Sequence, residues 1–334
     1  MSNKSPIHYA FHYSHYSQVL KEQRHYSVYL PDDYEHSPDQ YYPVLYLLDG
    51  EKYLLQAAGL VSSSQNGLSP TMPDMIIVAI HNVDRNRDYT PTHNVLLPDG
   101  ITTTPLFETT GGARTFIEYL QKELQPKIEQ DYRTSNPNVI VGHSFGGLLV
   151  LENLADENST FQGYICIDPS LWFDYPNNVQ RIEALLLNAT LDTQRSLFFA
   201  IANTAYTPGI GLSSLHKNLL HQLESKMQET PSLPFHLSSQ FYSHHDHHAV
   251  FIPALTDGLQ SIFHGYQINI SSKEFSINNV TQSMNLLNER LDSNLTPNLN
   301  KLEIIKAKAE KWPNMKINPD DISTLINHYR KKVE

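Results

Sequence analysis

The sequence predicts an α/β fold with a doubly wound, mostly parallel sheet. Short apolar runs rich in β-branched and aromatic residues alternate with stretches of helical length. Three of the runs, at 42–48, 75–81 and 138–142, are almost continuously apolar, which is typical of parallel strands that helices cover on both faces. The length of 334 residues, 40% of them hydrophobic, allows one large domain with a smaller addition.

The elements follow one another in the order expected of βαβ units. In the first predicted helix, Phe116, Leu120 and Leu124 recur every four residues, and Pro126 is expected to kink it. Strands are expected at 25–31, 42–48, 75–81, 138–142, 163–168, 196–202 and 235–241, and helices at 113–130, 145–156, 178–188, 213–228 and 252–263.

The chain after residue 269 has a different character. It carries three helical patterns, near 279–292, 299–311 and 319–332, and it is close to neutral although the whole chain has a net charge of −11. We therefore expect two domains, an α/β domain at 1–269 and a helical extension at 270–334. Packing on the α/β domain, forming a homodimer and covering a cleft are the roles open to the extension.

Bulk properties exclude several classes of partner. The negative net charge argues against binding to nucleic acid or to an anionic membrane. The chain contains no apolar run of about 18 residues, the length that crosses a bilayer, and its first residues do not resemble a signal peptide. The one cysteine, Cys166, lies in an apolar run, and we expect it to be buried and reduced. A cytoplasmic location is the simplest interpretation.

A nucleophile motif joins the expected strand at 138–142 to the next helix. Residues 142–146 read Gly-His-Ser-Phe-Gly, and a serine on such a tight strand-to-helix turn projects its oxygen above the sheet. The helix N-terminus brings N–H groups beside it, so the N–H of Phe145 is a candidate oxyanion donor. A glycine-rich turn without function is the alternative, and the flanking strand and helix argue against it. The sequence thus predicts an α/β-hydrolase fold with Ser144 as nucleophile.

The candidate base lies in a histidine-rich loop. In this fold the nucleophile is followed by the acid and then by the histidine. The last expected strand is followed by Tyr-Ser-His-His-Asp-His-His, and we choose His247 as the base, with His245 and His248 as alternatives. Histidine clusters also bind metals, but the sequence contains neither an HExxH motif nor a Cys/His zinc array. We expect no metal and no cofactor.

Further motifs point to a known family. The stretches YPVLYLLDGEKYL (42–54), IIVAIHNVDRNRDYTPTH (76–93), GGARTFIEYLQKELQPKIEQDYR (111–133), GHSFGGLLVLENL (142–154), DPSLWFD (168–174) and DHHAVFIPALTDGL (246–259) occur in this order. Together they resemble the putative-esterase (esterase D-like) family of α/β-hydrolases, nearest to its branch of trilactone siderophore hydrolases. The resemblance covers about residues 20–265, and its Asp-His pair at 246–247 favours His247 over its neighbours.

The resemblance implies further site residues. The second oxyanion donor would be the N–H of Gly50 or Glu51, in the loop after the strand at 42–48. His143, Arg85 and Trp172 are candidate substrate contacts.

Each of the arginines and the tryptophan has a structural alternative. Arg85 and Arg87 face an acidic substrate on one interpretation. On the favoured one they form a clamp with carboxylates, with Asp88 as a candidate partner. Trp172 lines the substrate pocket or packs in the core.

The acid of the triad is not where the resemblance implies. It should follow the strand at 196–202, but no Asp or Glu occurs between Asp192 and Glu224. Three alternatives stay open. Asp168, at the end of the preceding strand, supplies the acid; Glu224 reaches in from a helix; or a Ser–His dyad operates, with Asn203 or a backbone carbonyl orienting the imidazole.

These residues predict a serine hydrolase that cleaves carboxylic esters. Ser144 would form an acyl-enzyme with His247 as base. The partner would be a small-molecule ester, of the siderophore type or with a short acyl chain. An acyltransferase, or an impaired relative that only binds its ligand, is the alternative.

Overall fold

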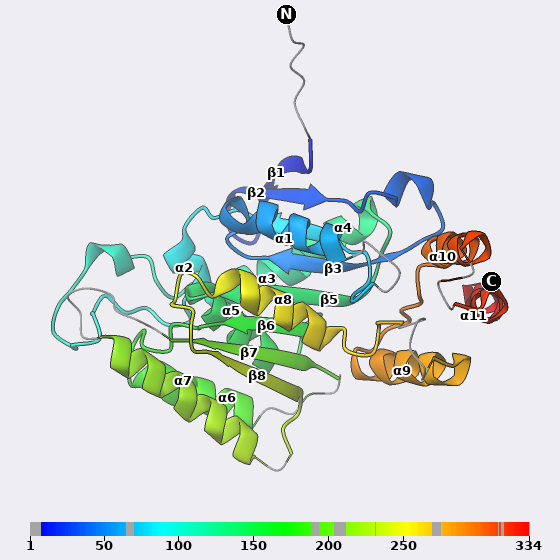
Figure 1. Cartoon of the computed structure of the whole chain (residues 1–334). Coiled ribbons are helices and arrows are strands. Elements are labelled where there is room, and N and C mark those ends of the chain that lie inside the picture. Colours follow the sequence, from blue (N-terminus) through cyan, green and yellow to red (C-terminus); the bar gives the residue numbers. More distant parts are fainter. Residues whose placement is uncertain are drawn as a thin grey trace, which may run out of the picture.

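A twisted β-sheet forms the centre of the molecule (Figure 1). The computed structural model describes residues 8–64, 70–188, 191, 194–203, 212–230, 232–268, 275–312, 314 and 317–333. Within these residues the sheet has eight strands in the order β1-β2-β4-β3-β5-β6-β7-β8. The strands are β1 (Phe11–Ser17), β2 (Glu22–Tyr29), β3 (Tyr42–Leu47), β4 (Ile76–Ile80), β5 (Thr134–His143), β6 (Gly163–Ile167), β7 (Ser196–Ala202) and β8 (His236–Tyr242).

The direction of the strands confirms the predicted fold class. From β4 to β8 in sheet order the strands run parallel, whereas β1 and β2 join antiparallel at one edge. Every residue of β3, β4, β6 and β7 is buried, because helices cover both faces. The seven strands that the sequence predicts are all present, with small shifts at their ends.

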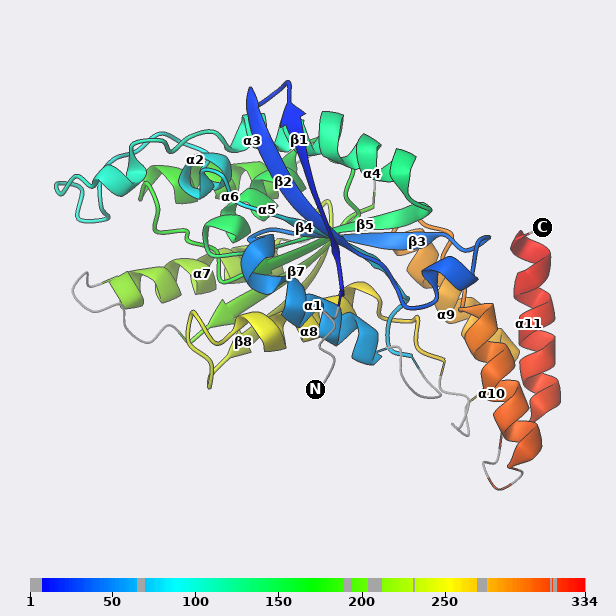
Figure 2. The same ribbon diagram turned by 90° about the horizontal axis from the view of Figure 1, so that it is seen from above.

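The sheet separates the core into two layers, each covered by helices. On one face pack α3 and α5–α7, and on the other α1, α8 and the helices of the extension. Figure 2 shows the same layers from above. The helices are α1 (Gly50–Ser64), α2 (Arg85–Tyr89), α3 (Ala113–Tyr119), α4 (Gln125–Asp131), α5 (Phe145–Ala155), α6 (Asn177–Leu187), α7 (Leu212–Glu229), α8 (Phe251–Ile262), α9 (Ile277–Arg290), α10 (Leu299–Lys311) and α11 (Pro319–Val333).

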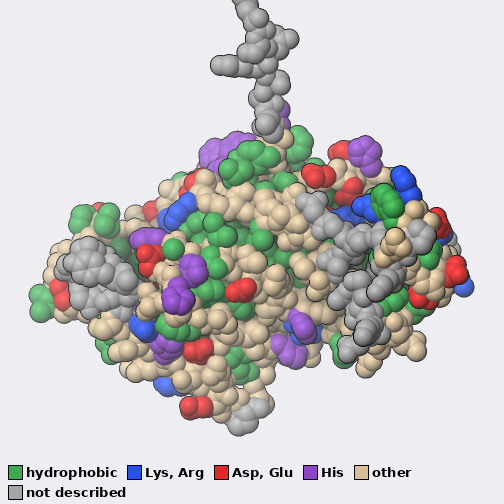
Figure 3. Space-filling view, viewed as in Figure 1, with side chains coloured by type: hydrophobic (Ala, Val, Ile, Leu, Met, Phe, Trp, Pro, Cys, Tyr) green, Lys and Arg blue, Asp and Glu red, His purple; other side chains and the backbone are tan. Residues whose placement is uncertain are grey.

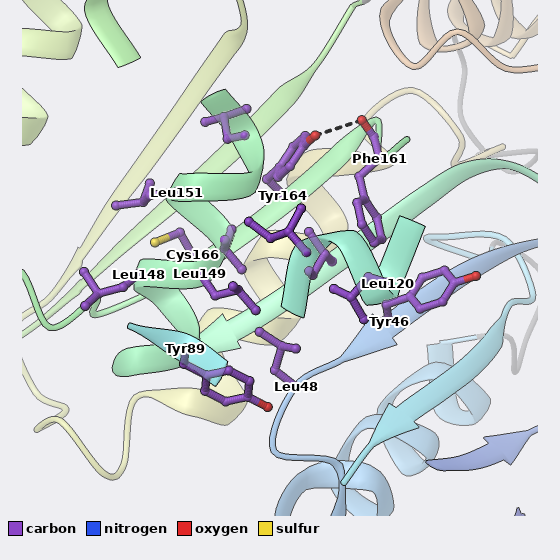
Figure 4. Packing of buried hydrophobic residues seen from close by; sticks show 14 of the residues in the cluster. Tyr46, Leu48, Tyr89, Leu120, Leu148, Leu149, Leu151, Phe161, Tyr164 and Cys166 are labelled. Carbon is purple, nitrogen blue, oxygen red and sulfur yellow. Dashed lines mark hydrogen bonds between the residues drawn. The ribbon is translucent and has the colours of Figure 1, made fainter. Parts of the chain in front are cut away.

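Successive residues of a central strand serve opposite layers of the core. Tyr46 and Leu48 pack in the layer under α5, whereas Leu45 and Leu47 pack under α1 and α8. Figure 4 shows the layer under α5, where Leu148 lies among side chains from several strands and helices. This close packing fixes the end of β5, where the candidate nucleophile stands.

Among the described strands and α-helices, three lie outside the ranges expected from the sequence. β1 pairs with β2 at the edge of the sheet, and most of its residues are exposed or half-buried, so it lacks an apolar run. α2 is a five-residue helix. α1 has a readable signal that we overlooked, because Tyr53, Ala57 and Val61 recur every four residues and are buried.

The kink expected at Pro126 takes the form of a change in helix type. A π-helical segment, η3 (Leu120–Leu124), separates α3 from α4, and Pro126 stands in the first turn of α4. The N–H of Gln125 bonds the carbonyl of Leu120, five residues back. Because proline has no N–H to donate, a break in the regular hydrogen-bond pattern occurs beside it.

The helical extension packs on the α/β region. Its three helices lie close to the predicted ranges, and Met284 of α9 and Leu325 of α11 share a core layer with α1 and α8. Asp74, before β4, accepts hydrogen bonds from Asn298 and Lys301 at 2.9 Å each. The division at residue 269 stays a prediction, since residues 269–274 lie outside the described ranges. Among the helices described, none is long and apolar enough to cross a membrane.

Candidate active site

Ser144 occupies a strained turn between β5 and α5. Its backbone has φ +62° and ψ −117°, a conformation that costs on the order of 1–3 kcal/mol and persists only where the surroundings fix it. Here the N–H of Ser144 bonds the carbonyl of Ile167 at 3.0 Å, and its own carbonyl accepts from the N–H of Ser170 at 3.1 Å. A Cβ at Gly142 would lie 2.3 Å from the carbonyl oxygen of Gly146, so this turn requires glycine at 142.

Asp168 and His247 are joined by a short hydrogen bond. His247 Nδ1 lies 2.6 Å from Asp168 Oδ2, although 79 residues separate the two in sequence. Asp168 directly follows β6, is fully buried and has φ +43°, a conformation that aspartate tolerates better than most residues. Its other oxygen, Oδ1, accepts from the N–H of Ala202 at 2.8 Å.

A second histidine binds the same carboxylate oxygen. His216 Nε2, from α7, lies 3.0 Å from Asp168 Oδ2. Burial raises the pKa of the Asp168 carboxyl, but hydrogen bonds from His216 and His247 outweigh burial and hold this pKa well below its usual range. Asp168 is therefore an ionised acceptor, and both imidazoles donate to it. No motif in the sequence marks His216, and its one signal is a position on the buried stripe of α7, beside Leu219 and Leu220.

The two other side chains proposed to orient His247 have different partners. The Glu224 carboxylate lies 3.2 Å from His221 Nδ1, and the Asn203 amide donates to the carbonyl of Ser243 at 2.9 Å. Within the described residues neither of these groups bonds His247, whereas Asp168 does. Of the histidines in the loop after β8, His247 is the one that bonds Asp168.

The loop that carries His247 is tied to the nucleophile turn. His143 Nε2 lies 2.7 Å from the carbonyl oxygen of His247, and the two rings lie 4.4 Å apart. Ser144 Oγ lies 2.9 Å from Ser170 Oγ, and within the described residues it has no hydrogen bond to His247. Hydrogen bonds between a nucleophile and its base are often long or poorly aligned and tighten only when the substrate binds. Because Nδ1 of His247 faces Asp168, its Nε2 is the nitrogen left for the serine. Figure 3 shows histidine side chains at several separate places on the surface of the molecule.

His143 has protein partners at both ring nitrogens. Nε2 faces the carbonyl of His247, and Nδ1 lies 3.2 Å from the hydroxyl of Tyr53. Burial, helped by the charge of His247, lowers the pKa of His143 to about 3, so its ring is neutral at physiological pH. The substrate contact that we expected of His143 therefore has no free nitrogen to make it.

Two helix N-termini meet beside Ser144. Phe145 is the first residue of α5, and Gly50 and Glu51 are the first residues of α1, so their N–H groups have no acceptor within their helices. A Cβ on Gly146 would lie 3.6 Å from Leu48 Cβ, which places the two turns in contact. The predicted oxyanion donors thus come from adjacent turns. The Glu51 carboxylate accepts from Asn82 at 2.6 Å.

The expected arginine clamp exists, with different partners for the two arginines. Arg87 bonds Asp88 at 2.8 Å and also pairs with Glu22, as the structural interpretation requires. Arg85 instead bonds both oxygens of Asp49, at 2.6 and 3.0 Å. It also donates to the carbonyl of His143 at 3.2 Å, and 31% of its side chain is exposed. Arg85 therefore braces the nucleophile turn from the Asp49 side.

Trp172 lies beside the candidate oxyanion residue. It is half-buried, with its ring centre 5.6 Å from that of Phe145 and 6.3 Å from that of Phe107. Both expected roles, packing and lining the pocket, are compatible with this position.

One set of side chains has the chemistry of a metal site. The ligand atoms of Asp168, His216 and His247 lie within 4.8 Å of one another, and two imidazoles with a carboxylate suit Zn²⁺ and similar ions. The two nitrogens, however, both point at one oxygen over 2.6 and 3.0 Å, which are hydrogen-bond distances. The geometry fits a hydrogen-bonded triplet.

Comparisons with known proteins agree with this geometry. The family model "Putative esterase" matches residues 17–262. The crystal structure of an IroE-like serine hydrolase from Shewanella oneidensis is 36% identical, with a TM-score of 0.88, and the match covers 96% of this chain and 99% of that one. The sheet and its flanking helices form an α/β-hydrolase-type fold like that of this neighbour.

Two curated relatives match over shorter stretches. The ferri-bacillibactin esterase BesA of Bacillus subtilis is 30% identical over 165 residues, which is 46% of this chain and 57% of the relative. The apo-salmochelin esterase of Escherichia coli O6:H1 is 27% identical over 193 residues, which is 55% of this chain and 59% of the relative. The chain thus spans somewhat over half the length of these relatives. Because the family model covers well over half of the chain, the protein belongs to the putative esterase family.

Proposed function

We propose that this protein is a serine esterase that cleaves carboxylic esters of small molecules through an acyl-enzyme on Ser144. The observation that carries the proposal is the 2.6 Å bond between Asp168 and His247 beside the strained turn of Ser144. A buried carboxylate that orients a histidine, next to an activated serine, is the constellation that acyl transfer requires. The match to the IroE-like serine hydrolase supports it over nearly the full chain.

The proposed reaction has two steps. His247 takes the proton of Ser144 Oγ as this oxygen attacks the ester carbonyl, and Asp168 stabilises the imidazolium that forms. The N–H of Phe145 and that of Gly50 or Glu51 bind the oxyanion. The alcohol then leaves with the proton of His247, and a water molecule, activated by the same histidine, releases the acid.

The relatives favour a siderophore-type ester as the substrate. BesA is named as a ferri-bacillibactin esterase and the E. coli relative as an apo-salmochelin esterase. A short acyl ester is the simpler alternative within the same chemistry. A cytoplasmic location stays a prediction from the sequence.

Labelling by a fluorophosphonate probe tests the proposal. We expect the probe to label the protein at Ser144 and Ser144→Ala to lose both the label and the hydrolysis of p-nitrophenyl acetate. Ser170→Ala is the matched control, because Ser170 Oγ lies 2.9 Å from Ser144 Oγ and carries no role in the two steps. Persistent turnover by Ser144→Ala would contradict the mechanism.

A further inference from the structure

The backbone holds the carboxylate of Asp168, the acid of this site, at one oxygen. Asp168 follows β6 directly, in a left-handed conformation, and among the described residues the backbone bonds its Oδ1 alone, through Ala202. Its Oδ2 must face His247 for the pair to work. A carboxylate held at one oxygen still has freedom to turn about its side-chain bonds, so a second contact is needed to fix its plane.

His216 supplies that contact. Its Nε2 lies 3.0 Å from the oxygen that also binds His247, and its ring lies 5.8 Å from the ring of His247 in an edge-to-face arrangement. Its side chain is 4% exposed, so the bond is shielded from water. α7, which carries it, is the helix that follows β7, the strand after which the acid was expected. This region of the chain thus contributes a donor to the site in place of the acid.

Packing alone does not explain a histidine at this position. Its neighbours on the buried stripe of α7, Leu219, Leu220 and Leu223, are apolar. His216 Nδ1 is buried and has no hydrogen-bond partner among the described residues. A leucine would fill the site without leaving a buried nitrogen unpaired, which is costly. The contribution of this histidine therefore lies at Nε2.

We propose that His216 is a positioning residue of the active site. It donates from Nε2 to Asp168 and, together with the N–H of Ala202, fixes the carboxylate in the plane that orients His247. The proposal rests on the proposed function. Its chemistry involves no proton transfer by His216 and no contact with the substrate.

A pair of substitutions separates this role from simple packing. His216→Leu removes the donor, and we expect kcat to fall about tenfold with KM nearly unchanged, since a hydrogen bond to a charged group is lost. His216→Gln places an N–H near the Nε2 position, and we expect it to retain most of kcat. His221→Leu, on the same helix, is the control that should leave kcat unchanged, because His221 faces Glu224. Equal kcat values for the Leu and Gln variants would overturn the proposal.

A spectroscopic measurement tests the same bond without turnover. In proton NMR spectra, hydrogen-bonded imidazole N–H groups resonate far downfield. We expect such signals from His216 and His247, beside that of His143, whose Nε2–H faces the carbonyl of His247. In His216→Leu one signal should vanish and that of His247 should shift, whereas an unmoved His247 signal would contradict the proposal. If the wild type hydrolyses no ester while the signals respond as expected, the proposed function fails and the positioning contact stands.

Metal binding is the competing use of the same three side chains. We expect dialysis against EDTA to leave esterase activity and the signals of His216 and His247 unchanged. Activity that is lost with EDTA and returns with Zn²⁺ would show that Asp168, His216 and His247 hold an ion, and it would overturn the positioning role.

Discussion

At the scale of single residues, the site depends on the charge of one buried carboxylate. Asp168 accepts hydrogen bonds from two imidazoles and one backbone N–H, and each of them favours its ionised form. We expect Asp168→Asn to lower kcat by up to about 10⁴-fold, because the amide favours the wrong tautomer of His247. Steady-state kinetics with p-nitrophenyl acetate measures the loss. Glu224→Gln is the control, and a comparable loss there would contradict the assignment of the acid.

His143 links the site to the stability of the fold. Its pKa is about 3 in the folded protein and about 6.5 in the unfolded chain, so the unfolded state binds more protons between these values. Stability should therefore fall as pH drops below about 6.5, by up to about 1.4 kcal/mol per pH unit from this group. Urea unfolding of the wild type and of His143→Gln at pH 7.0 and 5.0 tests this. Identical pH dependence in both proteins would refute the link.

At the scale of elements, the strand-to-helix turn depends on close backbone contact. The end of β5 and the start of α5 approach so closely that a Cβ at position 142 would lie 2.3 Å from a backbone oxygen. We expect Gly142→Ala to destabilise the fold by several kcal/mol, roughly the cost of overpacking with backbone displacement. Gly59→Ala in α1 is the matched control, because its Cβ would meet nothing within 4 Å, and it should be neutral or stabilising. Thermal unfolding of the two variants distinguishes them.

At the scale of the molecule, the extension stands apart from the site. Figures 1 and 2 place α10 and α11 at the opposite end of the sheet from α2, whereas Ser144 and Asp168 follow the carboxyl ends of β5 and β6. This placement argues against the extension as a cover over the cleft. Its role as a dimer contact stays a prediction.

A buried polar contact joins the extension to the sheet. Asp74 is 6% exposed and binds both Asn298 and Lys301. Burial raises the pKa of the Asp74 carboxyl, and the neighbouring Lys301 opposes that rise. We expect Asp74→Ala to lower the free energy of unfolding by about 1–3 kcal/mol and to speed proteolysis of α9–α11. The exposed Asp39→Ala is the control, and equal stability of the two variants would refute this contact.

The sequence by itself determined the order of the strands from β2 onward and of the helices from α3 onward, the turn of Ser144 and the loop of His247. These features are local, since apolar runs, glycine spacing and the position of a histidine after the last strand can all be read from neighbouring residues. The edge strand β1 escaped because its pairing with β2 leaves most of its residues exposed, so it has no apolar run to read.

Only the tertiary structure decided which groups meet at the site. In it Asp168, and neither Glu224 nor Asn203, bonds His247. His216, which no motif marks, bonds the same carboxylate. The physical reason is the parallel sheet: it sets the carboxyl ends of β6 and β7 side by side, so residues 34 to 79 positions apart share one carboxylate. Sequence spacing gives no measure of distance between strand ends, and which acid faces the histidine depends on packing across the sheet.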